Sequence, residues 1–270
     1  MCLFTIVTVT RNNCVGAAAT AQTVLEQDFA DYEYLVKDGA STDDTHKRLT
    51  EMGVRVISSL DHGVYDAMNQ ALALSQGRYV CFLNSGDRFS SRDVLSTVAL
   101  ALQNHGFPSF CYGDAISWDG LKPGLNGLAP DRARPICYRS QLSPFYLFRR
   151  TICHQAWFVD RELYRELGGF DLSFSISAAY DMQLRALLVA KASYLHVSKC
   201  VVVYEGGGIS GGNSPTMRKD RRMILERHYS FGQRMLYGSC FMIMYSLSRI
   251  ARPLVVRCAP ASLKAKFFGH

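Results

Sequence analysis

Two patterns of apolar and polar positions alternate along roughly the first 90 residues of the chain. Short apolar runs rich in Val, Ile and Tyr predict buried strands at residues 3–10, 32–36, 54–58 and 79–83. Apolar residues three and four positions apart predict helices at residues 16–27, 42–52 and 64–75. Strands and helices that alternate at this spacing indicate an α/β fold with a parallel, doubly wound sheet.

The pattern is less regular in the second part of the chain. A stretch rich in Gly and Pro predicts a long loop at 120–135, and helices are expected at 161–167 and 180–190. A strand at 199–204 runs into Glu205-Gly206-Gly207-Gly208, and this density of glycine favours a flexible lid.

The last part of the chain, 215–270, has its own composition. From residue 216 onward there are eleven Lys or Arg against two acids, whereas the whole chain has a net charge of +7. Residues 235–248 contain no charged side chain but are too few to span a bilayer as a helix. Interleaved apolar and cationic residues predict a helix that lies on an anionic membrane surface. A helix packed on the protein or on a partner subunit is the alternative.

Composition narrows the class of protein. The chain has 270 residues, of which 48% are hydrophobic and 20% charged, and this excludes a disordered protein. Its nine cysteines are scattered and form no C-x-x-C pair, so a reduced cytosolic chain is favoured and a zinc site is not expected. The first residues predict a strand rather than a signal peptide. No nucleic-acid-binding motif is present, and no nucleic-acid partner is expected.

Polar residues follow two of the predicted strands directly. Asp38 comes after the second strand, and Asn84-Ser85-Gly86-Asp87 after the fourth. Open α/β sheets bind ligands beyond the carboxyl ends of their strands. Asp38 could accept hydrogen bonds from a base or a sugar, or it could form a turn and helix cap with Ser41. A single Asp at position 87 suits Mg²⁺ or Mn²⁺ held together with substrate phosphates, and an Asx-turn is the alternative.

Several such motifs occur in order along residues 3–212. Tyr65, Asp66 and Asn69 share the polar face of the predicted third helix. The motifs are Thr8-Val9-Thr10-Arg11-Asn12, Asp38 to Asp43, Asp61 to Asn69, Leu83 to Asp87, His154-Gln155, Gly168-Gly169-Phe170-Asp171, Tyr180 to Arg185 and Gly207 to Ser210. Together they resemble the family-2 glycosyltransferases of the GT-A fold, and most closely the bacterial branch that builds exopolysaccharide, O-antigen and colanic-acid units.

The resemblance implies a GT-A nucleotide-diphospho-sugar transferase fold with a mostly parallel central sheet flanked by helices. Residues 1–107 would bind the nucleotide sugar, residues 108–214 the acceptor, and residues 215–270 would form a helical tail that associates with the membrane. The donor-binding residues that it implies are Thr8, Thr10, Arg11, Asp38, Ser41, Asp61, Tyr65, Asp66, Asn69, Asn84 and Ser85.

The resemblance also implies a metal ligand and an acceptor side. Asp87 would bind Mn²⁺ or Mg²⁺, because it is the one carboxylate that this chain keeps of the family's D-x-D-like element. The cation would neutralise the diphosphate leaving group. His154 and Gln155 would lie on the acceptor side, and a purely structural role for both is the alternative.

The catalytic base is where the chain departs from the family pattern. The first carboxylate of the family's Asp-x-Asp-Leu-x-x-x-Arg signature deprotonates the acceptor, and this position is Ala179 here. We predict that Asp181, the second position, takes the role, provided that its side chain does not point into the core. Another acid, or an impaired site, is the alternative, and Asp171 is less suited because it follows a helix stop.

The sequence therefore predicts an inverting, metal-assisted glycosyltransferase of surface polysaccharide biosynthesis. The expected donor is a UDP-sugar rather than a GDP-sugar, and the expected acceptor is a lipid-linked or growing glycan. The expected location is cytoplasmic, on the inner face of the cell membrane. Two other functions remain open: a nucleotidyltransferase, although residues 12–16 lack a Gly-rich basic loop, and a non-catalytic module that binds a sugar nucleotide or a membrane.

Overall fold

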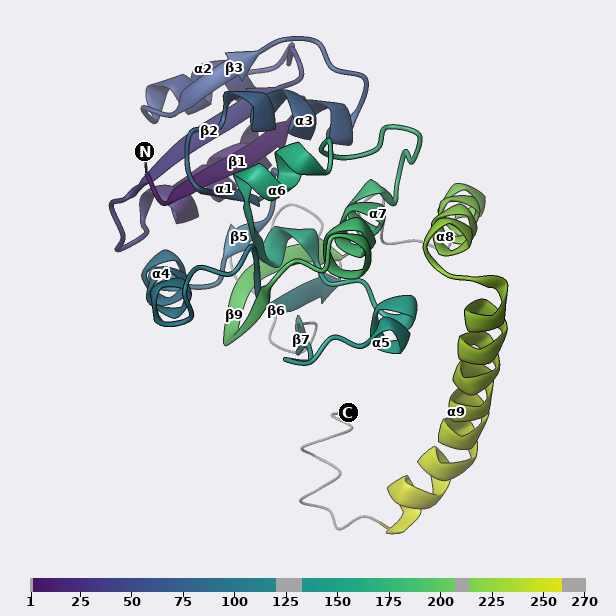
Figure 1. Ribbon diagram of the computed structural model, residues 1–270. Helices are drawn as coiled ribbons and strands as arrows, with labels where there is room; N and C mark the ends of the chain where they lie inside the picture. Colours follow the sequence, from purple (N-terminus) through teal and green to yellow (C-terminus); the bar gives the residue numbers. More distant parts are fainter. Residues whose placement is uncertain (1, 120–132, 207–213, 259–270) are drawn as a thin grey trace.

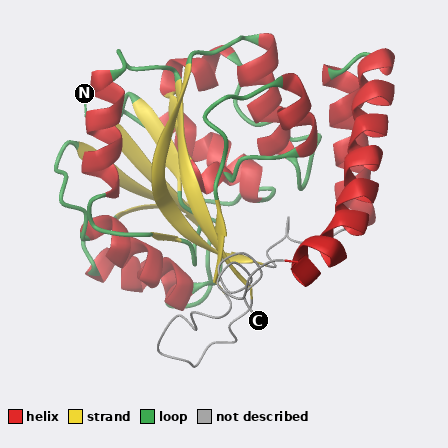
Figure 2. Ribbon diagram, turned by 90° about the horizontal axis from the view of Figure 1, so that it is seen from below, coloured by secondary structure: helices red, strands yellow, loops and turns green. Residues whose placement is uncertain are grey.

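The computed structural model describes residues 2–119, 133–206 and 214–258. A single twisted sheet runs through the body of the protein and has helices on both faces (Figures 1 and 2). The strand order is β3-β2-β1-β4-β8-β6-β9-β5, and β7 pairs with β6. The expected α/β class is confirmed.

The first part of the chain alternates strands and helices as predicted. The strands are β1 (Phe4–Thr10), β2 (Tyr32–Asp38), β3 (Arg55–Ser58) and β4 (Tyr79–Phe82), and they pair in parallel. The helices between them are α1 (Cys14–Leu25), α2 (Thr45–Glu51) and α3 (Val64–Leu74). Every residue of β1 and of β4 is buried, as expected for parallel strands with helices on both faces.

The register of these strands aligns their carboxyl ends. Thr10 of β1 pairs with Asp38 of β2, which pairs in turn with Ser58 of β3. Gly77, just before β4, lets the chain pass close to β1, since a Cβ there would lie 2.4 Å from the backbone nitrogen of Thr5. The loops after β1, β2 and β4 are thereby brought to one edge of the sheet.

The second part of the sheet is mixed in direction. It contains β5 (Arg88–Phe89), β6 (Phe110–Asp119), β7 (Ala133–Ile136), β8 (Trp157–Asp160) and β9 (Tyr194–Gly206). β8 is antiparallel to both of its neighbours, β4 and β6, and β5 is antiparallel to β9. The expectation of a mostly parallel sheet is therefore wrong for this part. An apolar run indicates that a strand is buried on both faces, but it does not indicate whether the strand is parallel or antiparallel to its neighbours.

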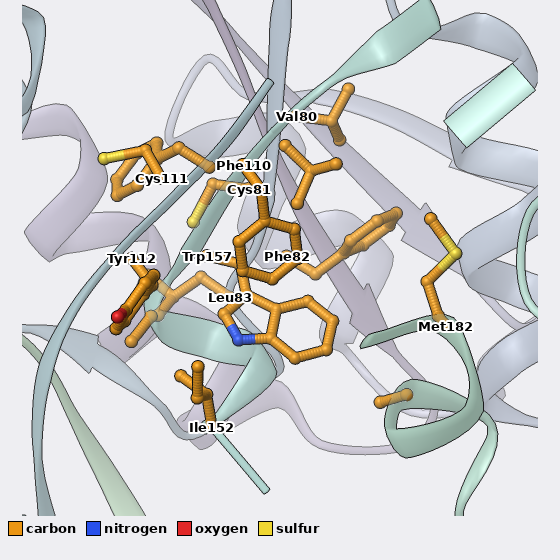
Figure 3. Packing of buried hydrophobic residues seen from close by; sticks show 14 of the residues in the cluster. Val80, Cys81, Phe82, Leu83, Phe110, Cys111, Tyr112, Ile152, Trp157 and Met182 are labelled. Carbon is orange, nitrogen blue, oxygen red and sulfur yellow. The ribbon is translucent and has the colours of Figure 1, made fainter. Parts of the chain in front are cut away.

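The core is centred where β4, β6 and β8 meet. Figure 3 shows Phe82, Phe110 and Trp157 packed together at this point, with Met182 nearby. The ring centroids of Phe110 and Trp157 are 5.1 Å apart. This dense packing fixes the β4 end on which the candidate site is built.

The remaining helices of the body are short, apart from α4 (Val94–Asn104). They are α5 (Pro144–Arg149), α6 (Arg161–Glu166) and α7 (Ala178–Leu184), which continues as a π-helical turn over Arg185–Val189. The helices expected at 161–167 and 180–190 are therefore present. The strand expected at 199–204 is longer, because β9 begins at Tyr194. Most of the predicted loop, 120–135, and of the predicted lid lies outside the described residues.

The tail forms two helices, α8 (Pro215–His228) and α9 (Phe231–Cys258). α8 lies beside α7, and α9 runs past α5 and away from the sheet (Figure 1). Tyr237 attaches α9 to the body through ring contacts with Phe145, Phe148 and Tyr229. In the part of the chain that the structure describes, no helix is long and apolar enough to cross a membrane.

Candidate active site

A cavity of about 860 Å³ opens at the carboxyl ends of β1 and β4. One wall comes from the ends of these strands and from α3, and the other from residues 150–155 and from α7 and α8. Of the residues assigned from the sequence, eight line this cavity: Thr10, Arg11, Tyr65, Asn84, Ser85, Asp87, His154 and Gln155. The site therefore lies where the strand ends were expected to place it.

Asp87 is the buried carboxylate of the cavity, with 7% of its surface exposed. The Nε2 group of Gln155 donates a hydrogen bond of 2.9 Å to Oδ2 of Asp87. The Cys153 thiol donates in turn to Oε1 of Gln155, at 2.8 Å. Burial raises the pKa of Cys153, so the sulfur keeps the proton that it donates. The chain Cys153–Gln155–Asp87 thus fixes the orientation of the carboxylate.

His154 lies next to this chain. Its Nε2 is 3.2 Å from Nδ2 of Asn84. Burial lowers the pKa of His154 to about 4, so the imidazole is neutral at pH 7. His154 and Gln155 were expected on the acceptor side, and both lie against the residues that follow β4.

Three residues of the cavity wall also carry buried oxygen atoms that have no partner in the described structure. Oγ1 of Thr10, Oδ1 of Asn84 and Oγ of Ser85 are buried and make no hydrogen bond. Buried polar atoms are usually paired, so these oxygens indicate a ligand. With Asp87 they form the oxygen-rich surroundings that Mg²⁺ and Mn²⁺ prefer. Among the described residues, no cluster of three or more His, Cys, Asp or Glu could hold a metal alone. A cation here would need phosphate oxygens of a substrate as further ligands.

Thr8 does not reach the cavity, although it was expected to bind the donor. Its side chain is fully buried, and its hydroxyl donates to the carbonyl of Leu83 at 2.8 Å and lies 3.0 Å from the Tyr34 hydroxyl. Thr8 therefore ties β1 to the end of β4. Thr8 and Thr10 are two positions apart on β1 and face the same side of the sheet, so their difference comes from their place along the strand: Thr10 is its last residue, whereas Thr8 lies further in and is covered by the end of β4.

Asp38 and Ser41 form a closed cluster rather than a cavity wall. The Asp38 carboxylate is fully buried and accepts hydrogen bonds from the Ser58 hydroxyl at 2.7 Å and from the backbone and hydroxyl of Ser41. Neither residue lines the cavity, and their contacts form the turn of the alternative but not its helix cap, since α2 begins at Thr45 with Asp44 as its N-cap.

Asp61 lies next to this cluster. Its carboxylate is 3.7 Å from Nζ of buried Lys37 and accepts a hydrogen bond from the Gly63 backbone. A Cβ at Gly39 would meet both Asp61 and Arg11, so the cluster adjoins the Arg11 side of the cavity without lining it.

The polar face of α3 is only partly at the cavity. Tyr65 lines it, and its hydroxyl donates to the carbonyl of Ile176 at 2.7 Å. Asp66 instead accepts a hydrogen bond from the His62 backbone at the start of the helix. Asn69 donates to the carbonyl of Phe170 and accepts from its N–H group, both at 2.9 Å. The expectation that Asp66 and Asn69 border a donor sugar is therefore corrected: their side chains are bonded within the protein.

Asp181 points into the protein. Its carboxylate is fully buried, bonds Arg185 at 2.7 Å and His228 at 2.8 Å, and does not line the cavity. The condition set for a base at this position is not met, so the assignment is corrected. Ala179, two residues earlier, lines the cavity in its place. Among the cavity residues that the structure describes, Asp87 is the only carboxylate.

Some residues of the cavity wall were not foreseen from the sequence. They include Arg150, Tyr138, Tyr180, Met217 and Arg221. Arg221 was counted only as part of the positive charge of the tail. No local pattern marks these residues, because they reach the cavity only after distant segments have packed together.

The sequence is similar to one protein family and to several bacterial glycosyltransferases. The sequence model of the family "Glycosyl transferase family 2" matches residues 5–168. A glycosyltransferase of Mycobacterium tuberculosis is 34% identical over 85% of this chain and 86% of its own length. A PGL/p-HBAD biosynthesis glycosyltransferase of Mycobacterium bovis is 32% identical over 77% of this chain and 79% of its own. Over a shorter part, 36% of this chain and 39% of its own, the Escherichia coli UDP-Glc:alpha-D-GlcNAc-diphosphoundecaprenol beta-1,3-glucosyltransferase WfgD is 32% identical.

Solved structures share the fold at low sequence identity. Residues 1–349 of Staphylococcus aureus TarS, in complex with UDP-GlcNAc, superpose with a TM-score of 0.64 at 15% identity over 83% of this chain. This chain spans 66% of that TarS fragment. The mannosyltransferase PcManGT of Pyrobaculum calidifontis, with GDP-Man and Mn²⁺, gives a TM-score of 0.54 at 15% identity over 99% of this chain and 88% of its own.

Proposed function

The chain belongs to glycosyl transferase family 2 and has a GT-A-like fold, and on that premise we propose the reaction that it carries out. The protein transfers a sugar from a nucleoside diphosphate donor to a hydroxyl group of a lipid-linked or growing glycan, with inversion at the sugar carbon. The family model and the similar proteins are named as glycosyltransferases, which favours this function over a nucleotidyltransferase.

The observation that carries this proposal is the cavity end formed by Asp87 and the unpaired oxygens of Thr10, Asn84 and Ser85. We propose that the donor diphosphate binds there together with Mg²⁺ or Mn²⁺. The cation would neutralise the charge that develops on the leaving nucleoside diphosphate. Gln155 would hold the Asp87 carboxylate in position through its 2.9 Å hydrogen bond.

The names of similar proteins suggest which donor and which acceptor this chain uses. The TarS complex contains UDP-GlcNAc, and the name of WfgD specifies a UDP-sugar donor and a lipid diphosphate acceptor. These names support a UDP-sugar as the donor and a lipid-linked glycan as the acceptor of this chain. We assign the donor to the half formed by residues 1–107 and the acceptor to residues 108–214, with 215–270 as the tail.

We further propose that the tail holds the enzyme on the inner face of the cell membrane. Met242 and Ile243 of α9 are each 59% exposed, and Met244 and Tyr245 are about half exposed. Four consecutive residues cover every side of a helix, and a helix that is apolar all round is normally buried in an apolar environment. The exposed Lys219 and Arg222 of α8 would attract anionic lipid.

One observation favours a second function. Ala179 faces the cavity and Asp181 does not, so the described cavity has no carboxylate besides Asp87 for deprotonating an acceptor. A protein that binds a sugar nucleotide without transferring it would also have this arrangement. Turnover distinguishes the two functions.

The test compares the wild-type protein with Asp87→Asn in the release of nucleoside diphosphate from UDP- and GDP-sugars, with Mn²⁺ or Mg²⁺. We expect a metal-dependent release that falls at least ~100-fold in the variant, because metal catalysis of this kind supplies several kcal/mol. Asp44→Asn is the matched control, since Asp44 is exposed and makes no capping hydrogen bond.

Three other outcomes would contradict parts of this proposal. An Asp87→Asn variant that keeps the wild-type rate would contradict the assignment of the donor site. Bound UDP without any release of diphosphate would favour the non-catalytic function. Release of pyrophosphate in place of the nucleoside diphosphate would indicate a nucleotidyltransferase.

A further inference from the structure

Two arginines line the cavity from segments other than the β1 and β4 ends. Arg150 follows α5, and Arg221 lies in the middle of α8. Neither is accounted for by the donor site, whose polar groups follow β1 and β4. They are therefore candidates for a second anion-binding position in the same cavity.

Arg221 is held in a defined position. Its Nη2 group donates to the carbonyl of Phe148 at 2.8 Å, and its guanidinium lies 5.0 Å from the centre of the Tyr180 ring. The hydrogen bond to Phe148 and the contact with the Tyr180 ring hold the guanidinium in place. Little side-chain entropy is therefore lost when another of its N–H groups binds a ligand.

Arg150 differs in that it is exposed and forms no ion pair with any described residue. Arg150 is only two residues from Phe148, whose carbonyl accepts the hydrogen bond from Arg221. Residues 148–150 therefore carry Arg150 and also hold Arg221 in position. An arginine that faces a cavity without a partner contributes positive charge to that cavity.

Among the residues that the structure describes, no carboxylate forms an ion pair with either arginine. Asp220, the neighbour of Arg221 in sequence, is 4% exposed and accepts hydrogen bonds from the backbone of Ile176 and Ser177 at 3.1 and 3.2 Å. Asp87 is the only carboxylate among the described cavity residues, and it follows β4 and accepts a hydrogen bond from Gln155. The arrangement is therefore complementary to a ligand with two negative charges.

Phe148 also connects this position to the tail. Its carbonyl holds Arg221, while its ring packs against Tyr237 of α9 with centroids 5.5 Å apart. A ligand phosphate at Arg150 and Arg221 would thus lie between the polar cavity and the root of the exposed apolar helix. A lipid-linked glycan has this order of parts: sugar, diphosphate, hydrocarbon.

We propose that Arg150 and Arg221 form a subsite for the diphosphate group of the lipid-linked acceptor. This inference rests on the proposed function and adds the chemical group by which the acceptor is recognised. Arginine pairs bind phosphate oxygens through parallel N–H donors, which lysine cannot reproduce.

The first test measures binding of inorganic pyrophosphate to the full-length protein by calorimetry in metal-free buffer, so that no cation can hold the anion at Asp87. We expect Arg150→Gln to weaken binding about tenfold, as loss of a charge-assisted hydrogen bond does. Arg221→Lys should weaken it too, because the charge remains but the fork is lost. Arg48→Gln is the control that removes one exposed charge elsewhere, on α2.

Asp87→Asn identifies the position of the anion. If pyrophosphate occupies the donor site, removing the Asp87 charge should change its affinity as much as Arg150→Gln does, and the proposal would be overturned. Wild-type affinity in Arg150→Gln, or no binding to the wild-type protein, would also overturn it. The Arg150 side chain forms no hydrogen bond or ion pair with another described residue, and thermal unfolding of Arg150→Gln checks that the variant is folded.

The second test measures transfer to two acceptors with the same sugar, one linked to a short polyprenyl diphosphate and one to a neutral octyl group. Arg150→Gln should raise the KM for the diphosphate acceptor about tenfold and leave the KM for the octyl acceptor and for the donor unchanged. A raised donor KM would assign the arginines to the donor diphosphate instead. If the wild-type protein transfers to neither acceptor, the proposed function fails, whereas pyrophosphate binding still decides the subsite.

Discussion

The Asp181 carboxylate is paired with cations from two segments. Arg185 contacts it from the π-helical turn that continues α7, and Arg227 and His228 contact it from the end of α8, at 3.2 and 2.8 Å. Burial raises the pKa of Asp181, but hydrogen bonds from His228 and Arg185 outweigh it, so that its pKa is lowered overall. This residue joins the tail to the body and keeps its charge inside the protein.

Replacing Asp181 by Asn should therefore affect stability before chemistry. We expect the free energy of unfolding at pH 7 to fall by about 3 kcal/mol, because the variant removes the charge of a fully buried carboxylate that bonds Arg185 and Arg227. Because the folded-state pKa is below the unfolded value, this stabilisation is present above about pH 4 and is lost as the pH falls through the folded-state pKa. Urea unfolding at several pH values measures both effects.

Asp171→Asn provides the matched control for Asp181. The Asp171 side chain is 31% exposed and bonds Arg227 at 2.7 Å, so its replacement should cost less than about 1 kcal/mol. An Asp181→Asn variant with wild-type stability and no turnover would contradict the structural role and restore Asp181 as the base.

Replacing Ala179 by an acidic residue is expected to increase the rate of sugar transfer. It lines the cavity at the position where the family signature has its first carboxylate. Ala179→Asp should raise the rate of transfer at least tenfold, since a well-placed general base contributes ~10²–10⁴. Single-turnover transfer to a lipid-linked acceptor measures this, with Ala178→Asp, whose side chain is fully buried, as a control that should only destabilise. An unchanged rate in a folded Ala179→Asp variant would mean that deprotonation does not limit transfer.

At the scale of elements, α3 is attached to the segment that leads into α7. Asn69 bonds both backbone groups of Phe170, and Tyr65 bonds the carbonyl of Ile176. Gly169 has a φ of +70°, and a Cβ there would lie 2.5 Å from Oδ1 of Asn69. The polar residues of α3 thus hold a loop in place, and the loop in turn sets where Ala179 meets the cavity.

Asn69→Ala should lower the free energy of unfolding by roughly 2–3 kcal/mol, because both backbone groups of Phe170 lose their partner. Thermal or urea unfolding measures this, and the donor KM at low temperature should stay at the wild-type value. Gln70→Ala, the next residue, bonds Asp66 and Leu60 near the surface and should cost less than half as much. If Asn69→Ala leaves stability unchanged but raises the donor KM, Asn69 contacts the donor as the sequence predicted.

The helices and strands of the first part of the chain were predictable because their signals are local. β1, β2, β3 and β4 are short apolar runs, and α3 has its apolar residues three and four positions apart. β8 was not predicted, and its direction could not have been, because the short apolar run from Trp157 to Val159 looks the same whichever way the strand points. Strand direction depends on the path of the connecting segments, which the run itself does not encode.

At the scale of the whole molecule, α9 is attached at its start through Tyr237 and touches α5 again where Arg149 contacts Phe241 and Met244, but most of its surface there is exposed. Tyr237 packs on Phe145, Phe148 and Tyr229, whereas residues 241–245 are all exposed. Figure 1 shows the helix extending past the body rather than over it. An apolar segment in this position is expected to bind an apolar surface outside the chain.

The double variant Met242→Gln, Ile243→Gln should therefore bind anionic lipid vesicles at least about tenfold more weakly than the wild-type protein, because burial of each apolar side chain contributes ~1.5–3 kcal/mol. Co-sedimentation with phosphatidylglycerol vesicles measures this, and added salt should weaken binding of both proteins. Leu100→Gln on α4 is the matched control, since Leu100 is also 59% exposed. Equal binding by the double variant, or a dimer that dissociates only in this variant, would mean that α9 packs on protein.

The sequence by itself determined the α/β alternation, the family and the position of the site at the strand ends. These features depend on apolar runs, on turn residues directly after them and on motifs a few residues long. Asp87 is an example: it follows a buried strand closely, so its place at the cavity was predictable from its place in the chain. Asn84 and Ser85 reach the cavity for the same reason.

Only the tertiary structure decided which side chains face the cavity. Ala179 and Asp181 are two positions apart on α7, which turns them about 200° relative to each other, so one reaches the cavity and the other the core. Arg227 and His228, whose side chains also bond Asp181, lie 46 and 47 residues further along the chain. Arg150 and Arg221 likewise meet at the cavity only because the carbonyl of Phe148 accepts a hydrogen bond from a helix 73 residues away. Such contacts depend on how distant segments pack, and no local pattern records them.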